Sequence, residues 1–136
     1  MAVSEAILQQ QVADYLTFQY PEVVFHSDFG SGIKLTPGQA KKQKRQNGGH
    51  RAWPDMFIAE PVFYTDIRKV RAGLFIELKK DGTRLKKKDG TWASDHIAEQ
   101  AEMLDILEFR GYRAVFCVGF DEAKQVIDEY LKEAGL

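Results

Sequence analysis

The sequence has no apolar run that approaches the roughly 20 residues of a membrane-spanning helix, so we expect no membrane association. Its N-terminus lacks the basic segment and apolar block of a secretory signal peptide. The single cysteine, Cys117, cannot form an internal disulfide, and no Cys/His spacing indicates a zinc site. These absences predict a cytoplasmic protein with one buried, inert thiol.

The chain also has little net charge, −1 over 136 residues, which by itself argues against a nucleic-acid-binding protein. The distribution of charge is uneven, however. Residues 34–88 hold 15 of the 19 basic residues and five of the 20 acidic ones, a local charge of +10 against −11 elsewhere. Such a basic block is suited to binding the phosphate backbone of a nucleic acid. The alternative is that the charges sort by chance and the block is a solvated loop.

The length and the 44% hydrophobic content predict one domain with a real core, residues 1–136, and no internal repeat is visible. Helical periodicity and short apolar runs predict the elements outside the central stretch. They are a helix capped by Ser4 that ends before Pro21, a strand at Val23–His26, a helix capped by Ser94 or Asp95, a strand at Ala114–Val118, and a last helix capped by Asp121.

The central stretch holds two apolar runs that we interpret as strands, Met56–Phe63 and Leu74–Leu78, joined by a partly basic segment, residues 64–72. Asp55 opens the first run. Because alternate side chains of a strand share a face, Glu77 and Lys79 lie on one face of the second. Charges on an apolar strand are costly unless they pair or hold a metal.

Two carboxylates and a lysine that converge in this way are suited to metal-assisted phosphodiester hydrolysis, because Mg²⁺ prefers oxygen ligands. The pattern Glu-x-Lys is weak by itself, and the chain contains a second copy, Glu122-Ala123-Lys124. That copy lies in a helical pattern, where two residues make about 200° of rotation, so its charges point apart. We interpret it as a solvated helix face.

The order Pro54-Asp55, then Glu77-Leu78-Lys79, then Gln100 resembles the motif of the PD-(D/E)XK nucleases, and within them the VRR-NUC group of the stand-alone phage or bacterial type. Gly111-Tyr112 and the apolar strand that follows also fit this group. The resemblance implies an α/β fold with a restriction-endonuclease-like core: a mixed four-stranded sheet flanked by helices, in the order α-β-(arm)-β-β-α-β-α.

The resemblance also implies a set of catalytic roles. Asp55, Glu77 and the backbone carbonyl of Leu78 would hold Mg²⁺ or Mn²⁺. Lys79 would position the attacking water, and Gln100 would hydrogen-bond Lys79 or a ligand carboxylate.

Glu5 resembles the first acidic motif of the family, which would act on the metal through water. Its alternative role is a favourable charge in the first turn of a helix. One turn before Gln100 lies His96, to which we assign no catalytic role.

Residues 28–53 form a basic, glycine-containing arm that differs in composition from the core. Thr36 or Pro37 predicts the start of a short helix that runs through Gln46 and ends at Asn47-Gly48-Gly49. A second basic surface is expected at a small hairpin between Asp81-Gly82 and Asp89-Gly90. The predicted DNA-binding residues are Lys34, Lys41, Lys42, Lys44, Arg45, Arg51, Lys80 and Arg84.

Together these features predict a metal-dependent DNA endonuclease, and the resemblance implies a homodimer that acts on branched DNA such as four-way junctions. Two alternatives remain: a non-catalytic nucleic-acid-binding module on the same fold, and a subunit of a larger complex that uses the arm for docking. One departure from the family is Ala52, where glycine is frequent. Alanine takes a positive φ less readily than glycine, so the placement of Asp55 is left open.

Overall fold

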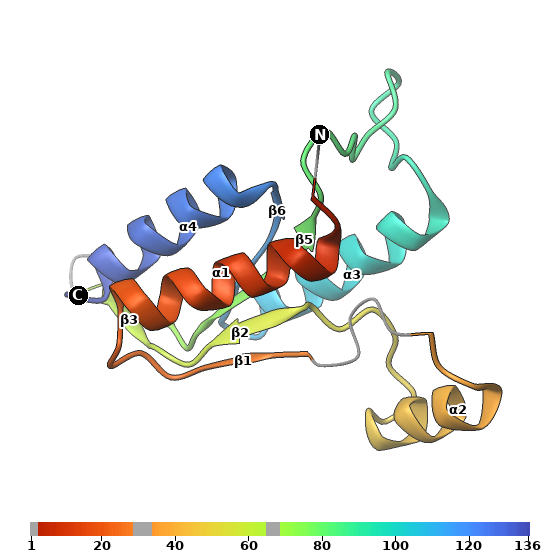
Figure 1. The fold of residues 1–136 in the computed structure, drawn as a ribbon, viewed down its shortest axis with the longest axis horizontal. Helices are drawn as coiled ribbons and strands as arrows, with labels where there is room; N and C mark the ends of the chain where they lie inside the picture. The colour runs from red at the N-terminus through yellow and green to blue at the C-terminus, as the bar shows by residue number, and fades with distance from the viewer. Residues whose placement is uncertain (1–2, 29–33, 65–68) are drawn as a thin grey trace.

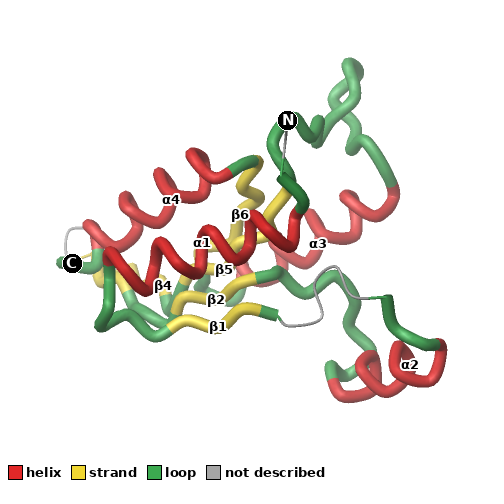
Figure 2. The backbone as a smooth tube through the Cα atoms, in the orientation of Figure 1, coloured by secondary structure: helices red, strands yellow, loops and turns green. Residues whose placement is uncertain are grey.

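The computed structural model describes residues 3–28, 34–64 and 69–136. Its main sheet is mixed and four-stranded, in the order β1-β2-β5-β6 (Figures 1 and 2). Strands β1, β2 and β5 are antiparallel neighbours, whereas β5 and β6 are parallel. The bounds of the strands are β1 Phe25–Ser27, β2 Met56–Ile58, β5 Leu74–Lys79 and β6 Arg113–Val118. This architecture confirms the predicted mixed α/β fold.

The helices form layers on the two faces of the sheet (Figure 1). Their bounds are α1 Glu5–Gln19, α3 Asp95–Phe109 and α4 Phe120–Glu133. Leu74, Ile76 and Leu78 of β5 belong to the core formed with α1 and α4, whereas Phe75 belongs to the smaller core formed with α3. The alternation predicted for this strand therefore places Glu77 and Lys79 on the α3 face.

A separate two-stranded sheet interrupts the predicted order. Strands β3 (Val62–Tyr64) and β4 (Lys69–Arg71) pair with each other and not with the main sheet. The interpretation of Met56–Phe63 as one strand was wrong, because Pro61 lacks an N–H and the run divides there. The Tyr130 hydroxyl of α4 donates to the Glu60 carbonyl at 2.6 Å, which fixes this corner. Residues 65–68 of the predicted connection lie outside the described residues.

Helix α2 (Pro37–Gln46) was predicted closely from local signals. Thr36 caps it in a capping box with Gln39, and Gly48 and Gly49 follow its C-terminal end with φ of 66° and 81°. None of its residues is buried. The helix extends away from the sheet on the side of the β2 N-terminus (Figure 1). Residues 29–33 of the predicted arm lie outside the described residues.

Two predicted boundaries were wrong. Helix α4 begins at Phe120 after Gly119, so Asp121 lies in its first turn and does not cap it. Gly119, with φ of 84°, donates its N–H to the Lys79 carbonyl at 2.8 Å, so the chain turns into the helix directly at the end of the sheet. Strand β1 begins at Phe25, two residues later than predicted.

Three other predicted features agree with the structure. Ser4 caps α1, and Ser94 caps α3. Cys117 is buried, and burial raises the pKa of its thiol to about 12. Across the described part of the chain, no helix is long and apolar enough to cross a membrane.

Candidate active site

Asp55 and Glu77 meet because of the register between β2 and β5. Met56 pairs with Ile76, so in an antiparallel ladder the preceding residue, Asp55, lies opposite Glu77. Asp55 Oδ2 accepts the N–H of Leu78 at 2.8 Å, and its backbone carbonyl accepts the N–H of Asp28 at 2.8 Å. These bonds hold the Asp55 carboxylate at the edge where the two strands end their pairing.

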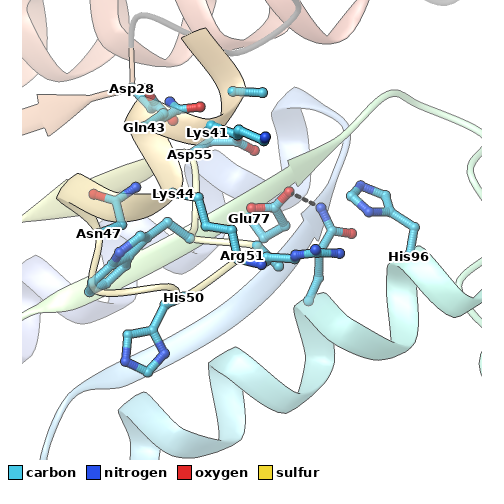
Figure 3. A pocket seen from close by; sticks show the side chains of 14 residues that line it. Asp28, Lys41, Gln43, Lys44, Asn47, His50, Arg51, Asp55, Glu77 and His96 are labelled. Carbon is cyan, nitrogen blue, oxygen red and sulfur yellow. Dashed lines mark hydrogen bonds between the residues drawn. The ribbon is translucent and has the colours of Figure 1, made fainter. Parts of the chain in front are cut away.

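Glu77 is a buried carboxylate, only 4% exposed. Its Oε1 accepts a 2.5 Å hydrogen bond from Nε2 of Gln100 on α3 (Figure 3). Its Oε2 has no hydrogen-bond partner within the part of the chain that the structure describes. Burial, followed by the nearby charge of Asp55, raises the pKa of Glu77 to about 9, although Lys79 opposes the shift. The site is therefore short of positive charge.

Lys79 is also buried, with 6% of its surface exposed. Its Nζ lies 4.0 Å from Glu77 Oε1, at the limit of an ion pair. The structure thus brings Asp55, Glu77, Lys79 and Gln100 together, as the motif predicted. Of the two partners predicted for Gln100, the amide bonds the carboxylate of Glu77.

The other two predicted site residues, Glu5 and Leu78, differ in their surroundings. Glu5 is exposed at the start of α1, and its charge contributes a small further increase to the pKa of Glu77. Leu78 is buried, with its N–H already bonded to Asp55. Residues 3–28, 34–64 and 69–136 contain no group of three or more His, Cys, Asp or Glu side chains placed to hold a metal ion.

The donor atoms nevertheless fit a hard divalent cation. Mg²⁺ is commonly bound through one or two carboxylates, with waters and substrate phosphates completing its shell. Asp55 and Glu77 supply two such carboxylates on adjacent strands, and the unpartnered Glu77 Oε2 is a buried oxygen that a cation would satisfy. A cation there would also favour the ionised form of Glu77.

A pocket of about 600 Å³ opens above these carboxylates. Asp55 and Glu77 line it together with Lys41, Lys44 and Arg51, three of the predicted DNA-binding residues of the arm (Figure 3). An acidic floor therefore faces a basic wall. This arrangement can accept a phosphate group while a metal ion neutralises the floor.

Several residues of this pocket were not predicted as site residues. They are Asp28, Gln43, Asn47, His50, Trp53 and His96. Most of them belong to the arm, and no local signal encodes where the arm lies relative to the two carboxylates. Asp28 directly follows β1. Its backbone carbonyl accepts a hydrogen bond from the side chain of the buried Gln9 at 3.0 Å.

The remaining predicted DNA-binding residues lie on exposed surface. Lys42 and Arg45 are exposed on α2, and Lys34 precedes it. Lys80 and Arg84 are exposed in the segment that leads to a small hairpin. The predicted position of that hairpin was wrong: the Asp89-Gly90 turn, expected at one end of it, is its tip, with a bridge between Lys86 and Trp92.

The approach to Asp55 contains a strained residue. Of the non-glycine residues that the structure describes, only Ala52 has a positive φ, 60°. The turn that favours glycine thus forms with alanine, at a cost on the order of 1 kcal/mol. Asp55 reaches Leu78 despite the substitution that had left its placement open.

No family model and no curated protein matches this sequence. One solved structure, titled "VRR_NUC domain protein", superimposes with a TM-score of 0.66 and 26% sequence identity. The alignment covers 97% of this chain and 91% of that one. The likeness therefore extends over nearly the whole chain.

Proposed function

We propose that this chain, whose fold is similar to that of a solved VRR_NUC domain protein, is a VRR-NUC nuclease, as its motifs predicted, and that it acts as a metal-dependent DNA endonuclease. The observation that supports this most strongly is the pair of carboxylates, Asp55 and Glu77, beneath a basic wall. Glu77 carries a buried oxygen without a partner among the described residues. A pocket used only for packing would not bury that charge beside a second carboxylate.

In this proposal Asp55, Glu77 and the Leu78 carbonyl would hold Mg²⁺ or Mn²⁺, and Glu5 would act on it through water. When bound, such an ion lowers the pKa of a coordinated water and neutralises charge on the scissile phosphate. Lys79 positions that water and stabilises the developing negative charge. Gln100 holds Glu77 in its ligating orientation through its 2.5 Å hydrogen bond.

Two basic projections flank the site and define a path for DNA. Helix α2 projects from the molecule beside the N-terminal end of β2, and the hairpin around residues 85–93 projects beyond the N-terminal end of α3 (Figure 1). Both carry exposed lysines and little buried surface. In this proposal each projection contacts phosphates on its own side of the cut, so the duplex crosses the pocket between them.

The finer proposal is that the substrate is branched DNA, such as a four-way junction, and that the active form is a homodimer. One chain contains one Asp55–Glu77 pair and therefore one cutting site. Resolving a junction needs two cuts, which two sites related by a twofold axis supply most simply.

The experiment that tests the catalytic assignment compares purified Asp55→Asn and Lys79→Ala with the parent on labelled DNA in Mg²⁺. Each variant should lose about 10²-fold or more in cleavage rate, while its DNA affinity stays near that of the parent. Glu122→Gln is a matched control, because it alters the second Glu-x-Lys copy, which lies exposed on α4. Parental turnover in either site variant contradicts the assignment.

The alternative is a non-catalytic nucleic-acid-binding module. The observation in its favour is that the described residues hold no cluster of three acidic or His/Cys metal ligands. It predicts salt-dependent DNA binding that is unchanged by EDTA, with no cleavage of duplex, flap or junction in Mg²⁺ or Mn²⁺. A docking subunit, the third alternative, predicts no salt-sensitive DNA binding at all.

A further inference from the structure

Trp53 is a large aromatic residue at the mouth of the pocket. Its side chain remains 40% exposed, and it lines the same pocket as Asp55 and Glu77. It stands two residues before Asp55, between the strained Ala52 and Pro54, whose φ is fixed by its ring. These two neighbours restrict the backbone on either side of Trp53.

The indole packs against the ring of Phe75. Its centroid lies 5.6 Å from that of Phe75, with an interplanar angle of 33°. Phe75 is in turn stacked against Phe57 at 4.5 Å and meets Tyr112 edge-on at 5.1 Å. Trp53 thus packs on Phe75, which is itself in contact with two further aromatic rings, while a large part of the Trp53 surface stays exposed. A tryptophan that served only as core would be covered on both faces.

The surroundings of Trp53 suit a nucleotide. Lys44 and Arg51 of the same pocket can pair with its phosphate, and the indole offers a flat surface for its base. A base inside a duplex is stacked on both faces by its neighbours, so it cannot also stack on Trp53. Only a base that is unpaired or displaced next to the cut can do so.

We propose that Trp53 is a stacking site for an unpaired or displaced nucleobase next to the scissile phosphate, and that it gives the enzyme a preference for branched DNA over continuous duplex. This inference rests on the proposed nuclease function and specifies its substrate class. Trp53 acts here by binding, because its indole contacts the base and takes no part in the cleavage step.

The first test measures the fluorescence of Trp53. The protein contains two tryptophans, so the Trp92→Phe variant leaves Trp53 as the single fluorophore. It is titrated in EDTA, which prevents cleavage, with a single strand of about 12 nucleotides, a blunt duplex of the same sequence, and that duplex with a single-stranded flap. The single strand and the flap should quench the emission, and the blunt duplex should not. Absent or equal quenching by all three overturns the inference.

The second test measures affinity in otherwise unchanged chains. Trp53→Leu should weaken binding of the flap by at least about 5-fold, whereas Trp53→Phe keeps most of it and blunt-duplex binding changes less than about 2-fold for both. The control for loss of an exposed aromatic side chain is Phe109→Leu. Phe109 lies on α3, is 89% exposed and does not line the pocket. Unchanged flap binding by Trp53→Leu shows that Trp53 only packs on Phe75, and an equal loss on both substrates shows no base preference. If Trp53→Leu fails to fold, the quenching of Trp53 in the Trp92→Phe variant decides whether the base stacks on the indole.

Failure of this inference is distinguishable from failure of the proposed function. If the parent cuts DNA in Mg²⁺ and Asp55→Asn does not, but Trp53 is not quenched, only the stacking site is lost. If Trp53 is quenched by the flap but the parent never cuts, the stacking site stands as part of a binding module, and the nuclease proposal fails.

Discussion

At the scale of single residues, the site depends on how Glu77 is kept ionisable. Its carboxylate is removed from water and faces Asp55, and both effects raise its pKa to about 9. Gln100 Nε2 donates a hydrogen bond to it at 2.5 Å, and the backbone of Asp55 also favours its ionised form. Gln100 in turn has an Oε1 atom without a partner among the described residues, so its orientation depends on that single bond.

We therefore expect Gln100→Leu to weaken metal binding by about 10- to 100-fold, because the ligand carboxylate loses the donor that orients it. Isothermal titration with Mn²⁺ measures this independently of activity. The control is Gln125→Leu, an exposed glutamine of α4 that bonds only Glu129 in the structure. Equal Mn²⁺ affinity in Gln100→Leu and the parent would show that Gln100 is no more than a packed amide.

At the scale of elements, α2 is stabilised by its caps and by little else. It buries none of its residues, so removing its charges should leave the fold intact. We expect the fourfold variant Lys41→Ala, Lys42→Ala, Lys44→Ala and Arg45→Ala to keep the parental melting temperature while DNA binding weakens. For every phosphate that the variant no longer neutralises, the slope of log K against log salt should flatten by about one unit. An unchanged slope would remove α2 from the DNA interface.

The contact between α1 and α4 provides a pH-dependent test of stability. Asp128 accepts hydrogen bonds from Tyr15 at 2.5 Å, Tyr20 at 2.7 Å and Lys124 at 3.0 Å. Burial alone would raise the pKa of Asp128, but these bonds outweigh it and hold the pKa below its ordinary value of 3.8. The same burial and the Asp128 charge raise the pKa of Tyr15 to about 12.

Because the folded pKa lies below the unfolded one, Asp128 contributes stability above pH 3.8, and that contribution is lost as the pH falls through the lower, folded value. We expect Asp128→Asn to cost about 1–2 kcal/mol near pH 7, and the cost to shrink toward pH 3. Chemical denaturation at several pH values measures it. Asp14→Asn, an exposed aspartate of α1, is the control, and a cost for Asp128→Asn that does not vary with pH would refute this assignment.

Local signals predicted those elements that depend on local interactions. Thr36, Pro37 and Asn47-Gly48-Gly49 bound α2 because caps act within a few residues. The alternation of β5 likewise predicted which side chains share a face. The start of α4 was missed because it depends on a hydrogen bond between Gly119 and Lys79, which are 40 residues apart. The approach of Asp28 and Trp53 to the carboxylates could not be predicted for the same reason.

At the scale of the whole molecule, charge separates the proposed DNA face from the rest. Residues 34–88 carry a net charge of +10, and the remainder of the chain carries −11. In our proposal a second copy of the chain binds the acidic remainder, which includes the outer surfaces of α1 and α4, while DNA binds the basic side. This division is consistent with two sites acting on one branched substrate.

We expect light scattering at micromolar concentration to give a mass near twice the 15.5 kDa of one chain, and a junction to be cut on two strands. The junction products are followed on both labelled strands in the same preparation. A monomeric mass with single nicks on every substrate would remove the junction-resolving proposal and leave the metal chemistry unaffected.

The central claim is that the Asp55–Glu77 pair holds a metal ion that cuts DNA. The most direct measurement incubates the purified chain with labelled duplex, flap and junction in Mg²⁺, in Mn²⁺ and in EDTA, and repeats each reaction with Asp55→Asn. The account predicts cleavage by the parent in either metal, none in EDTA, and a loss of about 10²-fold or more in the variant. Cleavage that persists in EDTA, or that Asp55→Asn retains in full, would contradict it.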